Sequence, residues 1–400
     1  MIDPKIFTAA LREAGFDFFT GVPDSLLKEL CACMNDTLGE EHHVIAANEG
    51  AAVALATGYH LGTGKAAVVY LQNSGTGNAV NPLLSLADPQ VYAIPMLLVV
   101  GWRGEPGVKD EPQHIKQGAV QEELMRALGY PYEILSEDED SAREQLGRLS
   151  GRMSEGGTPV ALLVRKGTFS EYGGAGAGQP AAGAAGAGGA SSAGEVSIAG
   201  GEAAPAAAVY PMSREEALSR ILPHLEESAR IVSTTGKTSR EIYELREARG
   251  EGHAKDFLTV GSMGHAISIA LGLARTRTAP VYCIDGDGAA IMHLGSLGVA
   301  AQRGGRNLRH IIVNNGAHES VGGQPTIGFA LSFERLAREL GYRATWTATN
   351  ADELDDRLEA LQAHDGPALL EVRVRAGARA DLGRPKSSPV ENKRAFMEGL

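Results

Sequence analysis

A tract of glycine and alanine near the middle of the chain limits what the sequence can fold into. From Gly173 to Gly194, 18 of 22 residues are Gly or Ala, and none is charged or aromatic. Such a segment cannot bury enough apolar surface to offset its ordering entropy. We therefore expect a flexible linker over roughly residues 172–210, which divides the chain into two domains at 1–171 and 211–400.

The overall composition narrows the class of protein. With 400 residues, of which 43% are hydrophobic and 22% charged, the chain is typical of a globular protein with more than one core. A net charge of −12 disfavours nucleic acid and anionic membranes as partners, because both attract basic surfaces. Three cysteines do not make a disulfide scaffold, and no apolar run is long enough to span a bilayer. The N-terminus lacks the features of a signal peptide, so we expect a cytoplasmic protein.

Both halves alternate strand-like and helix-like segments. The predicted strands are 43–47, 66–72, 93–101 and 159–165 in the first half, and 230–233, 257–260, 280–285, 309–314 and 367–374 in the second. Predicted helices cover 25–34, 50–60 and 121–129, and a capping box at Ser213 and Glu216 begins another. Several strands are apolar on both faces, which is typical of parallel strands covered by helices. The pattern predicts the α/β class, with two doubly wound parallel-sheet domains and no third domain between them.

Polar residues follow two neighbouring strands of the second half. Asp285-Gly-Asp-Gly288 closes one predicted strand, and Asn314-Asn315 ends the next. Ligands bind at the carboxyl ends of parallel strands, and Mg²⁺ prefers carboxylate and amide oxygens. Glycines beside Asp287 allow the backbone to approach a diphosphate, and a helix starting near Ala289 directs its amides toward it. A plain strand–turn–helix with solvated acids is the alternative interpretation.

This arrangement is similar to the thiamine diphosphate (ThDP) motif, in which GDG is followed by NN. The resemblance implies that Asp287 and Asn315 bind Mg²⁺ through their side chains and Ala317 through its carbonyl. It also implies that the backbone at Gly286, Gly288 and Ala289 lies against the cofactor.

A second match lies in the first half. The segment Asn48–Tyr59 resembles the part of ThDP enzymes that carries a glutamate against the aminopyrimidine ring, and Glu49 stands in that place. The resemblance implies that Glu49 favours the tautomer of the ring that removes the C2 proton of the thiazolium. The alternative is an acid at a helix N-terminus, which the helix dipole stabilises.

Two further segments of the second half match the same family. In Phe257–Ala266, Met263 occupies the place of the apolar residue that supports the bent cofactor, and the Gly261 carbonyl would face the pyrimidine amine. Met263 as ordinary helix core is the alternative. The turn with Gly236, Lys237 and Thr238 resembles the diphosphate-contacting turn. It is not a P-loop, because Ile231 stands where the first glycine of that motif is required.

Among ThDP enzymes, the chain resembles the phosphonopyruvate decarboxylases and the closely related sulfopyruvate decarboxylases. The segments that carry this resemblance are Gly21–Ser25, Gln72–Gly75, Asp110–His114, Asn314–Ser320 and the tail Arg384–Leu400. Pyruvate decarboxylases and acetolactate synthases insert a third domain where this chain has its Gly/Ala tract. The resemblance implies decarboxylation of 3-phosphonopyruvate to phosphonoacetaldehyde and CO₂, in the biosynthesis of a phosphonate natural product such as an antibiotic.

Other functions remain open at this point. Sulfopyruvate or another 2-oxo acid is an alternative substrate for a ThDP-dependent decarboxylase. A cofactor-binding relic that acts as an interaction protein is a non-enzymatic alternative, against which the intact Glu49, Asp287 and Asn315 argue.

A substrate with a carboxylate and a phosphonate needs cationic or amide donors. The candidates are Ser25, Asn73, His114 and Lys116 in the first half, and His318, Arg384 and Lys386 in the second. Asp24 and His114 are candidates for proton transfer to the substrate. As alternatives, Asp24 and Ser25 cap a helix, His114 is an exposed loop residue, Arg384 and Lys386 are solvated tail charges, and Asp110 and Glu111 are loop acids.

The cysteines and the assembly complete the predictions. Cys31 and Cys33 lie two apart on a predicted helix and point away from each other, and Cys283 lies on a strand. No metal-ligand spacing is present, so we interpret all three as reduced thiols.

The family resemblance implies a homodimer or homotetramer, with each site shared between a pyrimidine domain and a diphosphate domain.

Overall fold

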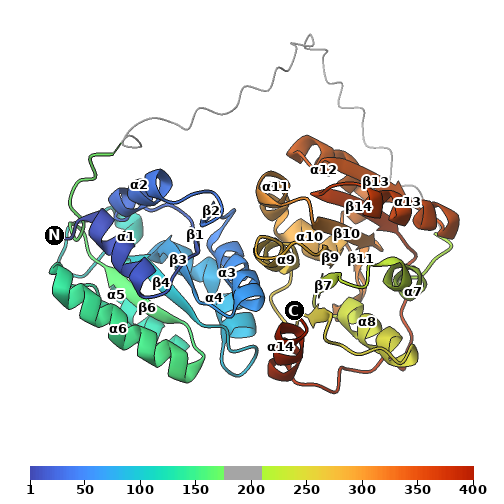
Figure 1. The fold of residues 1–400 in the computed structure, drawn as a ribbon, viewed down its shortest axis with the longest axis horizontal. Coiled ribbons are helices and arrows are strands. Elements are labelled where there is room, and N and C mark those ends of the chain that lie inside the picture. The colour runs from blue at the N-terminus through green and yellow to red at the C-terminus, as the bar shows by residue number, and fades with distance from the viewer. Residues whose placement is uncertain (175–209) are drawn as a thin grey trace, which may run out of the picture.

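The computed structural model describes residues 1–174 and 210–400 and contains two six-stranded sheets, one in each half of the chain (Figure 1). Apart from its ends, the predicted linker lies outside the described residues. Every pair of neighbouring strands in both sheets is parallel, as predicted for doubly wound α/β domains.

The sheet of the first half has the order β2-β1-β3-β4-β6-β5. Its strands are β1 (Phe19–Gly21), β2 (His43–Ile45), β3 (Ala67–Gln72), β4 (Met96–Gly101), β5 (Tyr132–Ile134) and β6 (Val160–Val164). The helices around it are α1 (Pro4–Glu13), α2 (Lys28–Thr37), α3 (Glu49–Thr63), α4 (Thr76–Pro82), α5 (Pro112–Leu128) and α6 (Glu139–Gly156).

The sheet of the second half has the order β13-β14-β10-β9-β7-β8. Its strands are β7 (Arg230–Ser233), β8 (Asp256–Leu258), β9 (Val281–Gly286), β10 (Leu308–Asn314), β13 (Ala344–Ala348) and β14 (Ala368–Arg373). The helices are α7 (Arg214–His224), α8 (Lys237–Ala248), α9 (Ala266–Ala274), α10 (Asp287–Met292), α11 (Leu294–Arg303), α12 (Phe333–Leu340), α13 (Ala351–Ala363) and α14 (Pro389–Glu398). A small antiparallel pair, β11 (Ala317–His318) and β12 (Gln324–Pro325), follows β10. The predicted capping box is present at the start of α7.

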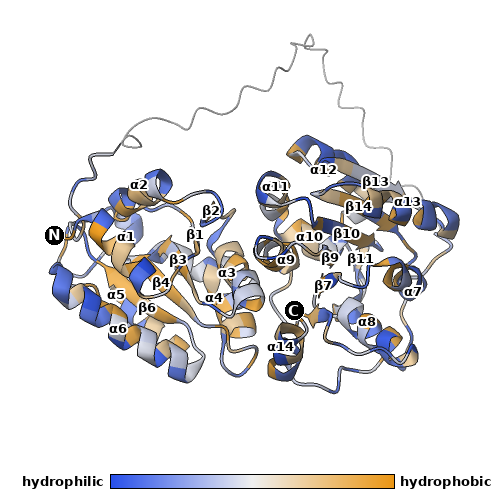
Figure 2. Ribbon diagram, in the orientation of Figure 1, coloured by the Kyte–Doolittle hydropathy of each residue, from blue (hydrophilic) through white to orange (hydrophobic). Residues whose placement is uncertain are grey.

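The two sheets have the same topology. Counted in chain order within each half, and with the β11–β12 pair left aside, both read 2-1-3-4-6-5. The central strands are apolar in both halves, as their hydropathy colouring shows (Figure 2). Every residue of β4 and β10 is buried, which is the burial expected of parallel strands covered on both faces.

The halves meet where α3 crosses α9, the two helices that follow the second strand of each sheet. Two glycines allow the close approach. A Cβ at Gly58 would lie 2.0 Å from the carbonyl oxygen of Ile269, and a Cβ at Gly272 would lie 2.2 Å from that of Leu55. α3 is buried along most of its length, from Gly50 to Leu61, so it is a central helix of the whole molecule rather than a surface helix.

Some boundaries and elements differ from the predictions. α2 begins at Lys28 instead of Ser25, and α10 begins at Asp287 instead of near Ala289. The strands β1, β5 and β13 and the helices α1 and α6 were not anticipated from the sequence. Across the described ranges, no helix combines the length and apolarity needed to cross a membrane.

Candidate active site

A pocket of about 310 Å³ opens at the carboxyl edge of the second sheet. Most of its lining comes from the turn after β7, the start of α10 and the loop after β10, and Arg214 and Met263 complete it. Almost all of the predicted cofactor and metal residues share this pocket: Gly236, Lys237, Thr238, Met263, Gly286, Asp287, Gly288, Ala289, Asn315 and Ala317. The substrate candidate His318 lies in the same wall, where its ring would be 2.7 Å from a Cβ at Gly288.

Asp287 is the carboxylate at the base of this pocket and is only 2% exposed. One of its oxygens accepts a hydrogen bond from the Thr326 hydroxyl, and the other accepts one from the Asn315 N–H at 3.4 Å. The Asn315 side-chain oxygen accepts from the Ala317 N–H at 3.1 Å. Burial raises the pKa of the Asp287 carboxyl. A cation bound beside Asp287 would offset this cost of burying its charge.

The turn between β7 and α8 is shaped to hold an anion. Gly236 has a φ of 101°, in the left-handed region, and caps α8 without a side-chain hydrogen bond to the first N–H groups. A Cβ at this position would lie 2.6 Å from the Ser320 hydroxyl. The Thr234 hydroxyl, which also lines the pocket, is buried and has no hydrogen-bond partner within residues 1–174 and 210–400. Free N–H groups at a helix N-terminus are typical of phosphate sites.

Glu49 lies at the start of α3, as predicted, and is half-buried. Asn78 donates a hydrogen bond to one of its carboxylate oxygens at 2.8 Å. The other oxygen has no donor among the residues that the structure describes. It faces Gly75, at which a Cβ would lie only 2.1 Å away. The site therefore leaves one carboxylate oxygen available to a ligand.

The residues on either side of Glu49 touch the second half of the chain. The Asn48 amide donates to the His293 ring at 3.3 Å, and a Cβ at Gly50 would lie 2.9 Å from the His265 ring. These two histidines stack on each other with ring centroids 4.2 Å apart. Burial, and to a lesser extent His293, lower the pKa of His265 to about 3, so its ring stays neutral. The residues that flank Glu49 are thus held against the second half.

The turn before α9 lies at the same boundary. The Ser85 and Ser262 hydroxyls are 2.8 Å apart, and Ser85 would also contact a Cβ at Gly261. Gly261 and Ser262 both have a positive φ, of 62° and 43°. Met263 lies in this turn, half-buried at the pocket wall, so its interpretation as ordinary helix core is wrong.

Three candidates of the first half follow adjacent strands, with Asp24 and Ser25 after β1 and Asn73 after β3. Asp24 is buried and accepts from the Gln72 amide at 2.6 Å and from the Leu26 N–H at 3.0 Å. Because α2 begins only at Lys28 and has no side-chain cap, the interpretation of Asp24 and Ser25 as helix caps is wrong.

Arg103, which the sequence analysis did not single out, joins these candidates. Its guanidinium donates to Asp110 at 2.8 Å and to the Ser25 hydroxyl at 2.6 Å. Its carbonyl accepts from the side-chain amide of Asn73, and its backbone N–H donates to the oxygen of the same amide. The hydrogen bond and ion pair with Arg103 lower the pKa of Asp110, so this loop acid has a specific partner. Arg103 lies two residues past the end of β4, so the strand-end rule could have found it.

His114 and Lys116 lie on α5, close to one another in sequence but in different environments. His114 is 8% exposed, and its carbonyl lies against Gly104, so the exposed-loop interpretation is wrong. Its Nδ1 has no partner in the described ranges. Lys116 is exposed, and within those ranges it forms no hydrogen bond or ion pair with the other candidates. Glu111 is an exposed residue that precedes α5.

The two charges of the C-terminal tail separate. Lys386 is exposed and forms a 3.8 Å ion pair with Glu247, as expected of a surface charge. Arg384 is exposed as well, but it lines a second cavity that adjoins the pocket of Asp287. Arg214 and Glu319, also missed from the sequence, form an ion pair at the pocket wall, and Arg214 donates to Glu241 at 2.7 Å as well.

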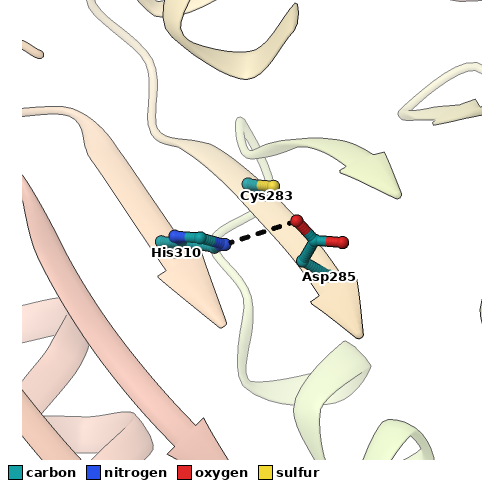
Figure 3. Close-up of side chains that lie close together, drawn as sticks. All are labelled: Cys283, Asp285 and His310. Atoms are coloured by element: carbon teal, nitrogen blue, oxygen red, sulfur yellow. Dashed lines mark ion pairs between the residues drawn. The ribbon is translucent and has the colours of Figure 1, made fainter. Parts of the chain in front are cut away.

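A buried polar cluster lies beneath Asp287, on β9 and β10. The ligand atoms of Cys283, Asp285 and His310 lie within 4.8 Å of one another, and all three residues are buried (Figure 3). His310 forms a 3.8 Å ion pair with Asp285. Cys283 and His310 are partners in the strand register, a proximity that spacing in the sequence does not reveal. These are zinc-type ligands, but burial raises the pKa of the Cys283 thiol and so disfavours the thiolate that binds metal. Cys31 and Cys33 are buried free thiols on α2.

Comparison with known proteins places both halves in one family. Residues 5–127 match the N-terminal TPP binding domain of thiamine pyrophosphate enzymes, and residues 234–372 match the C-terminal TPP binding domain. A phosphonopyruvate decarboxylase of Streptomyces hygroscopicus is 35% identical over all of this chain and 94% of its own length. The sulfopyruvate decarboxylase subunit beta of Methanothermobacter thermautotrophicus is 33% identical over 42% of this chain and 84% of its own.

A solved structure supports the fold. Benzoylformate decarboxylase from Polynucleobacter necessarius superposes with a TM-score of 0.68 over 95% of this chain and 100% of its own, at 12% identity. Together, the matched domains, the full-length relative and the shared fold show that this chain is a carbon–carbon lyase that belongs to the phosphonopyruvate decarboxylase family of thiamine pyrophosphate enzymes.

Proposed function

We propose that the chain decarboxylates 3-phosphonopyruvate to phosphonoacetaldehyde with ThDP and Mg²⁺. The observation that carries this proposal is the position of Glu49. Its neighbours in the first half contact His265 and His293 of the second half, beside the pocket that contains Asp287. A glutamate for the pyrimidine ring, and a pocket with basic side chains and the metal-binding carboxylate Asp287 for the diphosphate, are what this cofactor requires at its two ends. The similarity to phosphonopyruvate decarboxylases over the whole chain supports the choice of substrate.

The residues present fit the cofactor. The free oxygen of Glu49 would bind the aminopyrimidine ring, and the Gly261 carbonyl and Met263 would support the same ring from the other half. The N-terminus of α8 and the buried Thr234 hydroxyl would receive the diphosphate. Asp287, Asn315 and the Ala317 carbonyl would hold Mg²⁺, which offsets the buried charge of Asp287.

The chemistry divides between the cofactor and the protein. When bound, ThDP supplies a carbon nucleophile for the ketone and an electron sink for the bond that breaks. Glu49 holds the proton that selects the reactive ring tautomer. In the balanced reaction, the bond between the ketone carbon and the carboxylate breaks, CO₂ leaves, and one proton is taken up at that carbon. Asp24 and His114 are the groups of this site that would supply the proton.

Sulfopyruvate is the second candidate substrate, since sulfopyruvate decarboxylase subunits also match the chain. A sulfonate has the same tetrahedral shape as a phosphonate but carries one negative charge fewer. Turnover of the two substrates in competition separates the candidates. Equal or faster turnover of sulfopyruvate would contradict the proposed substrate.

The direct test measures aldehyde release from 3-phosphonopyruvate with and without added ThDP and Mg²⁺. We expect release only with both, and a loss of at least about 100-fold in Glu49→Gln, the size of a lost acid–base contribution. Activity that persists in Glu49→Gln would remove the proposed role of this carboxylate.

The assembly and the biological context are also part of the proposal. A homodimer or homotetramer is expected, and light scattering of the purified protein measures its size. Sites at subunit interfaces require that the first half of one copy take the place beside the second half of another copy that it has within its own chain in the structure. The irreversible loss of CO₂ suits a step of phosphonate biosynthesis, where it draws forward an unfavourable rearrangement that supplies phosphonopyruvate.

A further inference from the structure

A second cavity, of about 370 Å³, lies beside the pocket of Asp287. The two share Thr235, Gly236 and Arg240, which therefore form the wall between them. The second cavity also reaches Val260, the residue before Gly261. It thus extends from the proposed diphosphate turn to the proposed pyrimidine support. The reactive carbon of ThDP lies between the diphosphate and the pyrimidine, so this cavity borders the place where the substrate reacts.

Two arginines line this cavity without a counter-ion. Arg240 comes from α8 and Arg384 from the C-terminal tail. Within the described ranges, neither side chain forms a hydrogen bond or an ion pair. This differs from Arg214, Arg246 and Arg379, whose guanidinium groups are all paired with carboxylates.

The nearest carboxylates are already engaged. Glu244, one turn after Arg240 on α8, binds Arg379 and accepts from the Gly383 N–H at 2.7 Å. Glu247 pairs with His253 at 2.8 Å. The described lining of the cavity contains no Asp or Glu at all, in a chain whose net charge is −12. An anion in this cavity would therefore meet two positive side chains and no negative one.

The remaining polar groups of the cavity also favour an anion. The Thr235 and Ser387 hydroxyls line it and have no hydrogen-bond partner among the described residues. The Tyr92 and Ser239 hydroxyls are occupied by bonds to Leu258 and to Thr234. The free groups are thus hydroxyls and guanidinium groups, which suit a tetrahedral oxyanion with several acceptor oxygens.

We propose that Arg240 and Arg384 bind the phosphonate of the substrate and set the preference of the enzyme for a 2-oxo acid with an anionic group at C3. This assignment rests on the proposed function. Arg103, the other arginine near the site, is less suited to the phosphonate, because its guanidinium is committed to Asp110 and Ser25. A sulfonate would use the same donors, so the test below includes both anions.

The first measurement compares two substrates. In Arg240→Gln, we expect kcat/KM for 3-phosphonopyruvate to fall about 100-fold, the loss typical of a charged hydrogen-bond partner. Pyruvate lacks the C3 anion, so its slow turnover should change less than about threefold. Arg240→Lys should recover part of the loss. Arg394→Gln, which removes an exposed arginine of α14 outside the cavity, is the matched control and should behave as wild type.

The second measurement does not depend on turnover. Calorimetry with phosphonoacetate, and in parallel with sulfoacetate, reports anion binding to the protein without cofactor. We expect phosphonoacetate to bind at least about tenfold more weakly to Arg240→Gln and to Arg384→Gln, and more weakly still to the double variant. Melting temperatures near that of wild type would show that the variants are folded.

The outcomes separate the two proposals. If wild type releases no aldehyde but binds phosphonoacetate through these arginines, the proposed function fails and the anion site stands. If the double variant binds phosphonoacetate as wild type does, or if Arg240→Gln slows pyruvate and phosphonopyruvate equally, the anion site is wrong. Tighter binding of sulfoacetate would keep the site but assign it to a sulfonate.

Discussion

Gly75 and Glu49 are fitted to each other so closely that one methyl group at position 75 must displace the carboxylate. The backbone of Gly75 has a φ of −77°, which alanine adopts without strain, so the effect of Gly75→Ala is steric. We expect kcat/KM to fall by about 100-fold, as a misplacement of about 1 Å does, with little change in stability. Steady-state kinetics and melting curves measure the two effects.

Gly77→Ala is the matched control for this prediction. Gly77 lies two residues away, and a Cβ there would meet nothing within 4 Å. Its activity should equal that of wild type. If Gly75→Ala is as active as Gly77→Ala, the position of Glu49 does not matter to the reaction in the way we propose.

His60, on the buried helix α3, makes stability depend on pH. Burial, and to a lesser extent Lys393, lower the pKa of His60 to about 4, from an ordinary value of 6.5. The folded state therefore resists protonation that the unfolded state accepts. The contribution of His60 to the free energy of unfolding is therefore fully present above about pH 6.5. It is lost as the pH falls toward 4, and the whole loss is about 3 kcal/mol.

The variant His60→Gln tests this linkage. Between pH 7 and pH 5, the free energy of unfolding should fall by about 2 kcal/mol less in His60→Gln than in wild type. Urea unfolding at the two pH values measures the difference. His364→Gln, at an exposed position of the second half, should follow wild type. Equal acid sensitivity of all three proteins would contradict the prediction.

At the scale of elements, the crossing of α3 and α9 depends on glycine. In Gly58→Ala, the new Cβ would overlap the backbone of Ile269, which cannot rotate away as a side chain would. We expect a loss of about 1–3 kcal/mol in the free energy of unfolding, as for an overpacked core. Gly147→Ala on α6 is the contrasting variant, because its Cβ points into open space.

The contrasting variant should change stability in the opposite direction. Alanine at position 147 should stabilise α6 by about 0.5–1 kcal/mol, because glycine is the poorer helix former. Urea unfolding of both variants checks the two signs. Stabilisation by both substitutions would show that α3 and α9 do not pack as closely as described.

The sequence predicted best those elements whose residues face only one kind of environment. β4 and β10 are wholly buried, so their uninterrupted apolar runs identified them. β5 and β13 are mostly half-buried edge strands, and β1 has three residues, so none shows a clear period. α6 buries only four of its eighteen residues, and its charged exposed face hides the stripe that packs on the sheet.

The same reasoning explains which parts of the site could be predicted. The strand end before Asp287 and the turn at Gly236 are set by local sequence, and both residues line one pocket as expected, although α10 begins two residues earlier than predicted. Arg103 and Arg240 were missed, and the closeness of Cys283 to His310 was not foreseen, because each depends on neighbours distant in the chain. Cys283 lies beside His310 only through the register of β9 and β10, and Arg240 shares a cavity with Arg384 only because the tail returns to α8.

At the scale of the whole molecule, the Gly/Ala tract should act only as a tether. Removing residues 183–194 should change kcat/KM by less than about twofold, because the entropy of closing a loop varies slowly with its length. Kinetics of the shortened chain beside wild type provide the measurement. A large loss would show that this part of the chain contributes to the site.

The shared strand order of the two sheets has a consequence for how copies of the chain assemble. α3 and α9 are equivalent helices of two repeated units, so the first half of one copy can cross the second half of another copy in the same way as its own. Such domain swapping adds no new interface and is limited only by the reach of the tether. A mixture of two inactive variants, Glu49→Gln and Asp287→Asn, should then recover activity after co-refolding, since some swapped pairs unite two intact halves. Absence of recovery would mean that each site forms from the two halves of one copy.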